Sequence, residues 1–347
     1  MEKILSVIVP SYNMEKLLPK CLGSLVVDDR MLLDSLDVIV VNDGSKDRTS
    51  EVGHQYETRY PGVFRVVDKP NGNYGSCVNA GLKIAVGKYV KVLDADDYVD
   101  VDLFGEYLEE LMAADADLIL NDYDKVDPDG CVISTSKYEV PSARFALDDV
   151  KGQYLEIHAI TYRLSNLQAI GYRQTEGMSY TDLEWSILPM ALVQSAIRFN
   201  KPLVKYLVGR GGQTMEPTRY AKNFWMVEKL SLGLVEKSKA LPRSLCAESG
   251  RAWLDWRIRD QMESLYSSAV LGFANTQLDT HIFDVDRQLE ELDGDVYHDL
   301  EGKAILSKRF RLSFVDEVRQ HPHRLRYSIA AFRAYSFLVR KLSALIR

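Results

Sequence analysis

The first hundred residues alternate short runs of β-branched residues with segments of helical periodicity, and this alternation restricts the folds open to the chain. The apolar runs lie at 5–9, 38–41, 64–67 and 89–93, and the helix-like segments between them at 14–25, 48–60 and 76–86. Strands separated by single helices form parallel sheets with helices on their faces. We therefore predict an α/β half, with a parallel sheet wrapped by helices, over residues 1–103.

Two regions with different patterns follow this half. Residues 104–215 mix both patterns, with a predicted helix over 104–113 and a predicted strand over 117–122. We assign this region to the second half of one α/β domain that spans 1–215. From 216 to 347 tryptophan and leucine recur at helical spacing, which predicts a helical C-terminal region.

The charge distribution and the cysteines exclude several function classes. The chain has a net charge of −7, whereas residues 303–347 contain eleven Lys and Arg against two acidic residues. An acidic body with a basic tail argues against nucleic-acid binding. The four cysteines form no C-x-x-C pair, which indicates neither a zinc site nor a disulfide framework. A reduced compartment fits this pattern.

The N-terminal sequence predicts where the protein resides. The first strand begins after only a few residues, which leaves no room for a secretory signal. No stretch reaches the roughly 18 uninterrupted apolar residues of a membrane-spanning helix. We therefore expect a cytoplasmic protein.

Polar residues follow the first two predicted strands. The first run ends in Pro10, Tyr12 and Asn13, where a nucleotide base can lie against the backbone. Asp43 follows the second run and can accept a hydrogen bond from a uracil N–H or a ribose hydroxyl. Ligands of open α/β sheets bind at the carboxyl ends of the strands, so this placement suits a nucleotide site. Each cluster taken alone also fits a helix cap.

A glycine-bearing loop follows the third run and leads into a helix. It contains Asn71, Gly75 and Asn79, and backbone N–H groups at such a helix start can approach a diphosphate. The sequence has neither the Gly-Lys-Ser/Thr of a Walker loop nor a dinucleotide G-x-G-x-x-G, which argues against a dehydrogenase. A plain connector is the alternative interpretation of the loop.

The fourth run ends in Asp94, Ala95, Asp96 and Asp97. Alternate residues of an extended segment point the same way, so Asp94 and Asp96 can present oxygens on one side. Such crowding of negative charge is unfavourable unless a cation offsets it. We therefore predict that these carboxylates hold Mg²⁺ or Mn²⁺ together with diphosphate oxygens. Capping of a helix that begins near Asp102 is the alternative.

A fifth cluster lies near 180 and contains Thr181, Asp182 and Glu184. Asp182 is a candidate general base. The same residues also fit the N-terminus of a helix, with Thr181 or Asp182 as the cap and Glu184 in the first turn. The two roles are sterically compatible.

In content, order and spacing, the five clusters resemble family 2 glycosyltransferases, most of all the non-processive bacterial enzymes that build surface polysaccharides. The resemblance covers about 3–215 and implies a GT-A fold, an α/β fold with a Rossmann-like half and a mixed sheet. Residues 1–103 would be the nucleotide-sugar half of this domain, and residues 104–215 its acceptor half. It implies inverting transfer of a sugar from a nucleotide-diphosphate donor, a UDP-sugar above all, to a hydroxyl of a glycan or lipid-linked glycan.

The resemblance also implies roles for single residues. Asp43 would recognise the base or ribose, Asp94 and Asp96 would form the D-x-D element, and Asp96 would hold Mn²⁺ or Mg²⁺. Asp182 would be the base, although Thr181 stands where the family usually has Glu, so the choice between Asp182 and Glu184 stays open. The implied donor contacts are Pro10, Tyr12, Asn13, Asp43, Asn71, Gly75, Asn79, Asp94 and Ala95.

The family's usual Arg-Asn pair is replaced here by Val78-Asn79. A basic contact to phosphate or sugar is therefore expected from elsewhere, and Lys69 and Lys91 are the candidates. His158 is a candidate acceptor contact or a structural histidine. A processive synthase would need a Q-x-x-R-W element and membrane helices, which the sequence lacks, and the glycine-rich basic loop of a nucleotidyltransferase is also missing. A non-catalytic nucleotide- or carbohydrate-binding module is the remaining alternative.

The last residues form an apolar stripe flanked by basic residues over 324–347. Two interpretations stay open for the segment 320–347. It is either an interfacial helix on the inner, anionic face of the membrane, close to a lipid-linked acceptor, or a helix that packs on protein, including a homodimer partner.

Overall fold

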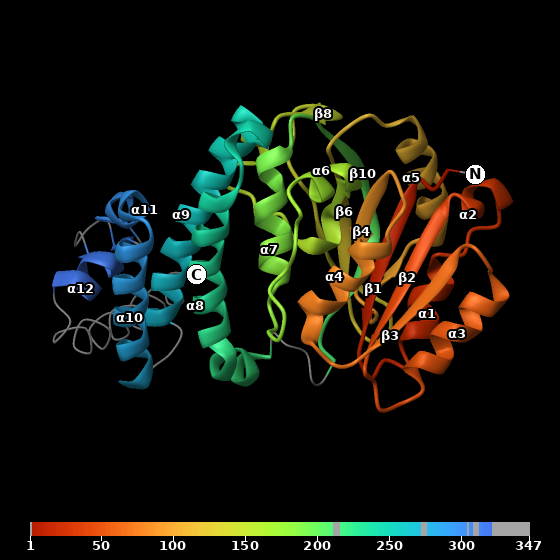
Figure 1. Cartoon of the computed structure of the whole chain (residues 1–347), viewed down its shortest axis with the longest axis horizontal. Coiled ribbons are helices and arrows are strands. Elements are labelled where there is room, and N and C mark those ends of the chain that lie inside the picture. The colour runs from red at the N-terminus through yellow and green to blue at the C-terminus, as the bar shows by residue number, and fades with distance from the viewer. Residues whose placement is uncertain (1, 211–215, 272–275, 304, 308–311, 321–347) are drawn as a thin grey trace, which may run out of the picture. The chain divides into compact units, whose positions relative to one another are not determined.

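The computed structural model describes residues 2–210, 216–271, 276–303, 305–307 and 312–320. The chain divides into two compact units (Figure 1). The first comprises Met1–Glu216 and Ala240–Leu254, and the second comprises Pro217–Lys239 and Asp255–Arg347. The basic helix that the sequence predicts over 320–347 lies outside the described residues from 321 onward.

A ten-stranded mixed sheet forms the centre of the first unit. Its strands follow the order β3 (Phe64–Lys69), β2 (Leu36–Asp43), β1 (Leu5–Ser11), β4 (Tyr89–Val92), β9 (Ile160–Arg163), β6 (Leu118–Val126), β10 (Ala196–Leu207) and β5 (Tyr98–Val99). Two further strands pair outside this path, β7 (Val132–Ser136) with β6 and β8 (Arg144–Phe145) with β10. The strands β3, β2, β1 and β4 are parallel, whereas β9 is antiparallel to both of its neighbours.

The first two strands are apolar runs that are buried along their whole length. Continuous apolar runs are typical of parallel strands that are covered on both faces. Gly81 of α4 (Asn73–Ile84) packs on Ile8, and Gly53 of α3 (Thr49–Arg59) packs on Val40 and Val66. Ile8 pairs with Ile39, the neighbour of Val40, so the two helices lie on opposite faces of the sheet (Figure 1).

Among the described residues, five more α-helices lie entirely within this unit. They are α1 (Leu18–Ser24), α2 (Arg30–Asp34), α5 (Val101–Ala113), α6 (Leu164–Ala169) and α7 (Asp182–Ile187). The 3-10 helices are η1 (Leu147–Val150), η2 (Ile157–Ala159), η3 (Leu188–Leu192) and η4 (Arg243–Leu245). The sequence did not predict α2, whose Asp29 cap accepts hydrogen bonds from the backbone N–H groups of Met31 and Leu32.

The C-terminal region contains α8 (Pro217–Ala240), α9 (Glu248–Leu271), α10 (Thr276–Leu292), α11 (Gly294–Asp299) and α12 (Phe314–Gln320). These helices confirm the predicted helical region, and two short antiparallel strands, β11 (Ile305–Ser307) and β12 (Leu312–Ser313), lie between α11 and α12. Among the described helices, none combines the length and the apolar composition needed to cross a membrane.

Candidate active site

Asp43 organises the loop that precedes α4. The residue is only 3% exposed. The Lys69 Nζ lies 2.6 Å from Asp43 Oδ1, and the backbone N–H of Gly72 donates to the same oxygen at 2.9 Å. The Asn71 amide donates to the backbone oxygen of Asp43 at 3.0 Å. The predicted base-binding carboxylate therefore also fixes the glycine-bearing loop beside the end of β2.

The end of β1 is joined to the segment after β2. The backbone N–H of Asn13 donates to Ser45 Oγ at 3.0 Å, and Asn13 Oδ1 accepts from the backbone N–H of Lys46 at 2.8 Å. Pro10 is buried in β1, whereas the ring of Tyr12 is 44% exposed. Of these residues, Tyr12 has the accessible surface that a stacked base requires.

Three non-glycine residues of the described chain adopt a left-handed backbone: Asn13 (φ 54°), Asn73 (φ 64°) and Tyr180 (φ 68°). Asparagine tolerates this conformation, whereas a tyrosine rarely adopts it. Each residue lies in or beside a cluster that the sequence singled out. Backbone strain of this kind concentrates at functional sites.

Gly75 and Asn79 make contacts other than those predicted from the sequence. A Cβ on Gly75 would lie 2.1 Å from the backbone oxygen of Thr175, so the glycine allows close packing of that loop on α4. Asn79 Nδ2 donates to the Gln174 backbone oxygen at 2.9 Å, and Asn79 Oδ1 accepts from the Gln174 N–H at 2.8 Å. Both residues thus join α4 to the loop 172–176, and their donor contacts stay a prediction.

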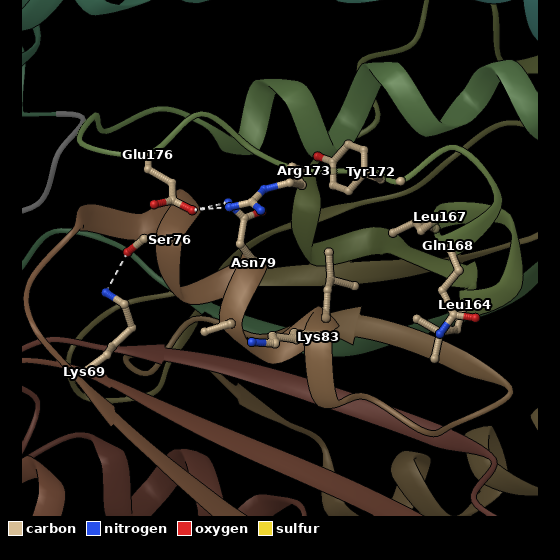
Figure 2. A pocket seen from close by; sticks show the side chains of 13 residues that line it. Lys69, Ser76, Asn79, Lys83, Leu164, Leu167, Gln168, Tyr172, Arg173 and Glu176 are labelled. Carbon is tan, nitrogen blue, oxygen red and sulfur yellow. Dashed lines mark hydrogen bonds and ion pairs between the residues drawn. The ribbon is translucent and has the colours of Figure 1, made fainter. Parts of the chain in front are cut away.

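A pocket of about 480 Å³ lies along the outer side of this junction, between α4 and α6 (Figure 2). Leu164, Leu167 and Tyr172 line one part of it, and the basic residues Lys83 and Arg173 line another. The pocket does not include the carboxylates that follow β4.

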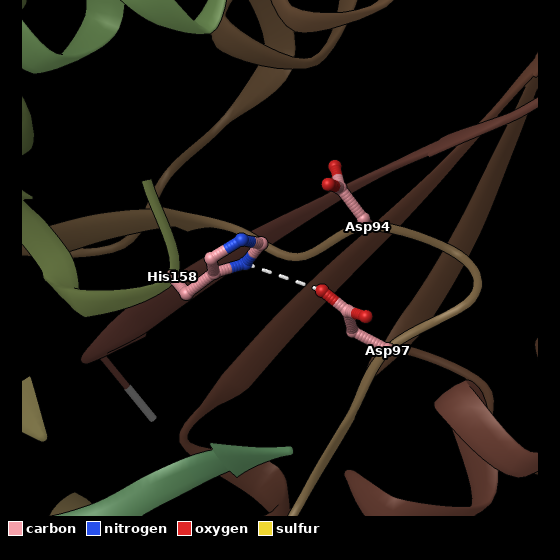
Figure 3. Close-up of side chains that lie close together, drawn as sticks. All are labelled: Asp94, Asp97 and His158. Carbon is pink, nitrogen blue, oxygen red and sulfur yellow. Dashed lines mark ion pairs between the residues drawn. The ribbon is translucent and has the colours of Figure 1, made fainter. Parts of the chain in front are cut away.

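The segment after β4 forms a turn rather than an extended strand. The backbone N–H of Asp97 donates to the backbone oxygen of Asp94 at 2.9 Å. This turn brings the Asp94 and Asp97 carboxylates together, and His158 of η2 joins them (Figure 3). One ligand atom of each residue lies within 4.8 Å of the others. The sequence argument for Asp94 and Asp96 assumed an extended segment, and that assumption is wrong.

Burial perturbs the charges of this acid cluster, which we define as Asp94, Asp97 and His158. Burial, followed by the charges of Asp97 and Asp96, raises the pKa of Asp94 to about 7. The Tyr74 hydroxyl donates to Asp94 Oδ1 at 2.7 Å, and this hydrogen bond lowers the pKa of Asp94 without cancelling the rise. Burial likewise raises the pKa of Asp97, although the neighbouring imidazole opposes this shift. Burial alone would lower the pKa of His158, but Asp97 outweighs it and the net shift is upward.

The donors of the acid cluster fit a divalent ion. Carboxylate oxygens and imidazole nitrogens are ligands of Mn²⁺ and related ions. Asp97 Oδ2 is buried and makes no aligned hydrogen bond, because His158 Nδ1 approaches it at 3.2 Å outside hydrogen-bond geometry. An oxygen with a free lone pair beside two like-charged groups is the environment that a cation stabilises.

Asp96 faces a different partner. Arg210, which follows β10, donates through Nε to Asp96 Oδ2 at 2.8 Å, and its Nη2 contacts the same oxygen. Ala95, between the carboxylates, is buried. The role of Asp96 as a metal ligand therefore stays a prediction. The sequence analysis did not single out Arg210, and its position between two glycines is the only signal there.

The two candidate bases near 180 differ in environment. Glu184 is fully buried, and it accepts hydrogen bonds from the Thr175 backbone N–H at 2.6 Å and from Thr175 Oγ1 at 2.8 Å. Asp182 at the start of α7 keeps an exposed side chain. Enough protein surrounds it that desolvation raises its pKa, while its own backbone N–H and the charge of His158 oppose the shift.

The two lysines proposed as phosphate contacts are already engaged. Lys69 bonds to Asp43 and donates to Ser76 Oγ at 2.8 Å. Lys91 is buried in β4, where its Nζ donates to Asn121 Oδ1 at 3.0 Å and to the His158 backbone oxygen at 2.9 Å. Burial lowers the pKa of Lys91 to about 7. In this structure, Lys91 therefore supports the backbone of His158.

The N-terminal part of the chain is similar to a known protein family. Residues 6–158 match the family described as Glycosyl transferase family 2. The chain is 36% identical over 116 residues to the uncharacterized glycosyltransferase EpsJ of Bacillus subtilis, with 33% of each chain covered. It is 34% identical over 133 residues to the chondroitin synthase of Pasteurella multocida, which covers 38% of this chain and 13% of that protein. The chain thus spans about a third of the length of the first curated relatives that it matches.

Among solved structures, S. aureus TarS 1–349 in complex with UDP-GlcNAc has a TM-score of 0.67 at 18% identity. The similarity covers 94% of this chain and 92% of that one. This likeness confirms the predicted GT-A-like α/β fold with a mixed sheet and C-terminal helices. Residues 6–158, which contain the first four of the five clusters, thus match the Glycosyl transferase family 2.

Proposed function

We propose that this chain is an inverting glycosyltransferase that moves a sugar from a UDP-sugar to a hydroxyl of a glycan or lipid-linked glycan acceptor. The observation that carries the proposal is the acid cluster, which follows β4 in the same sheet as the parallel strand that ends in Asp43 and contains a histidine whose charge acts on Asp182. The TarS relative was solved with UDP-GlcNAc bound, which supports the choice of a uridine nucleotide. We assign the catalytic domain to residues 1–215.

The ends of the parallel strands supply the donor side of the proposed site. The exposed ring of Tyr12 can stack on a base, and Asp43 is held by Lys69 and Gly72 in one orientation. Ligands bind at this edge in open α/β sheets. The loop from Asn71 to Ser76 would then face the diphosphate through backbone groups at the start of α4.

The acid cluster would hold Mn²⁺ or Mg²⁺ through Asp94, Asp97 and His158, with Asp96 as a further ligand. Such an ion, when bound, stabilises the negative charge that develops on the departing diphosphate. Asp94 has to lose its proton before it can act as a ligand, because burial raises its pKa to about 7. Tyr74 and the 94–97 turn hold the carboxylates in place.

Asp182 is the better base of the two candidates. Glu184 uses both carboxylate oxygens to hold Thr175, and its side chain has no access to solvent. Asp182 is exposed, and its raised pKa brings its basicity closer to that of a group working near neutral pH. It would accept the proton of the acceptor hydroxyl while that oxygen attacks the anomeric carbon, and a single displacement of this kind inverts the configuration.

The experiment is a donor screen followed by a variant. UDP release from several UDP-sugars is measured with Mn²⁺ and a mixture of glycan acceptors, and UDP binding is measured separately by thermal shift. We expect Asp182→Asn to retain UDP binding and to lose about 10²–10⁴-fold in transfer rate.

Asp295→Asn, which changes an exposed carboxylate of α11, serves as the matched control and should keep the wild-type rate. Normal turnover by Asp182→Asn would remove Asp182 from the mechanism. Failure of every UDP-sugar to bind would refute the proposed donor class.

A further inference from the structure

The contact between Arg210 and Asp96 places a positive charge against the carboxylates that follow β4. Two guanidinium nitrogens of Arg210 converge on a single oxygen, Asp96 Oδ2, with Nε at 2.8 Å. The contact is largely shielded, since the Arg210 and Asp96 side chains are 27% and 14% exposed. A shielded, charge-assisted contact of this kind is stronger than an ion pair on the open surface.

Asp96 differs from Asp94 and Asp97 in the part of the chain that supplies its partner. Asp97 contacts His158 and accepts from the Leu207 backbone N–H at 2.9 Å, and Asp94 accepts from Tyr74 at 2.7 Å. Those partners belong to η2, β10 and α4, which are regular elements of the first unit. Arg210 instead belongs to the chain that leaves β10, which ends at Leu207.

We infer that Arg210 gates Asp96, so that the carboxylate becomes available to a divalent cation only when a diphosphate draws the guanidinium away. This inference rests on the proposed function. An arginine fork matches phosphate oxygens as well as it matches a carboxylate, so the nucleotide offers Arg210 an alternative partner. Release of Asp96 Oδ2 then completes the negative site for the cation.

The gate has a thermodynamic consequence. In the protein without nucleotide, a cation must displace Arg210 from Asp96 before it gains that ligand, and its affinity is lowered by the strength of the ion pair. UDP removes this competition, so UDP and the cation bind cooperatively. Each ligand must then raise the affinity of the other by the same factor.

The test measures Mn²⁺ affinity by electron paramagnetic resonance of the free ion, with and without saturating UDP. Wild type is compared with Arg210→Gln and with Arg210→Lys, which keeps the charge but not the fork. Arg30→Gln is the matched control, because it removes an arginine from an ion pair with Asp34 on the exposed surface of α2.

For Arg210→Gln we expect Mn²⁺ binding without UDP to tighten by about ten-fold, and the factor by which UDP enhances Mn²⁺ binding to shrink by about the same amount, within the roughly 5–150-fold range of site coupling. Arg210→Lys should fall between wild type and Arg210→Gln, and Arg30→Gln should match wild type.

The coupling factor separates a gate from simple loss of charge. If Arg210→Gln tightens Mn²⁺ equally with and without UDP, the arginine acts only through its field and the gate is overturned. Unchanged Mn²⁺ affinity without UDP overturns it as well. If none of the four proteins binds Mn²⁺ even with UDP, the metal-dependent function proposed above fails together with the gate. If UDP enhances Mn²⁺ binding in wild type and the variants have the same Mn²⁺ affinities as wild type, the gate fails and that function stands.

Discussion

Replacing Asp94 by asparagine should stabilise the metal-free protein at alkaline pH, although it removes a residue proposed to serve catalysis. Asp94 has an ordinary pKa of 3.8 when unfolded and a pKa of about 7 when folded, mainly because burial and the charges of Asp97 and Asp96 disfavour its ionised form. The amide oxygen of the introduced asparagine would still accept the Tyr74 hydroxyl, which now donates to Asp94 at 2.7 Å. The substitution therefore removes the charge and keeps the hydrogen bond.

The direction and size follow from proton linkage. Between pH 4 and 7 the folded protein binds the Asp94 proton more tightly than the unfolded chain does, so this contribution to stability is lost as pH rises through that window. A rise in pKa from 3.8 to about 7 corresponds to about 4 kcal/mol, since each pKa unit is worth about 1.4 kcal/mol. Asp94 keeps partial contact with solvent and titrates together with Asp97, so we expect Asp94→Asn to gain about 2–4 kcal/mol at pH 8.

Urea unfolding in EDTA at pH 4.5, 6 and 8 measures this gain. The unfolding is monitored by tryptophan fluorescence, to which the buried Trp185 of the first unit contributes. The difference between variant and wild type isolates Asp94, because the other titrating groups are common to both proteins. We expect the variant to be more stable by only about 1 kcal/mol at pH 4.5, and its advantage to grow as pH rises. A variant no more stable than wild type at pH 8 would refute the electrostatic account of the acid cluster.

Two further substitutions test the packing and the buried charge around the site. Gly75→Ala should cost about 1–3 kcal/mol in urea unfolding, because the new Cβ would lie 2.1 Å from the Thr175 backbone oxygen. Gly105→Ala, which meets no atom within 4 Å, should gain about 0.5–1 kcal/mol, and equal effects of the two would contradict the packing argument. Burial lowers the pKa of Lys91 to about 7, so wild type should gain about 3–4 kcal/mol relative to Lys91→Met between pH 7 and 10. A difference that stays flat over this range would show that Lys91 is not desolvated.

The fold of the first unit was predictable because its signals are local and repeated. Buried parallel strands contain continuous apolar runs, and β1 and β2 each contain such a run and are buried along their full length. The boundaries were less accurate where special backbone geometry intervenes. The helix α4 begins at Asn73 rather than at Ser76, and Asn73 carries a left-handed φ of 64° that the sequence pattern does not reveal.

The candidate site was predictable only in part, because its pairings depend on tertiary contacts. The sequence pointed to Asp94 and Asp96 from strand alternation, but the turn after β4 brings Asp97 to Asp94 instead. His158 and Arg210 reach the carboxylates from distant elements, η2 and the end of β10. Neither contact has a signature in the spacing of residues. The activity class was predictable from the resemblance of the five clusters taken in order, and not from any single cluster.

The loop 172–176 lies between the glycine-bearing loop that precedes α4 and the segment that bears Asp182. On one side it rests on Gly75 and Asn79 of α4, and the Gly177 backbone N–H donates to the Gly72 backbone oxygen at 2.9 Å. On the other side, Glu184 of α7 accepts hydrogen bonds from the backbone N–H and the hydroxyl of Thr175. A displacement of the glycine-bearing loop would therefore also move the segment around Asp182. We expect the position of the Asp182 carboxylate relative to an acceptor hydroxyl to change when the donor binds.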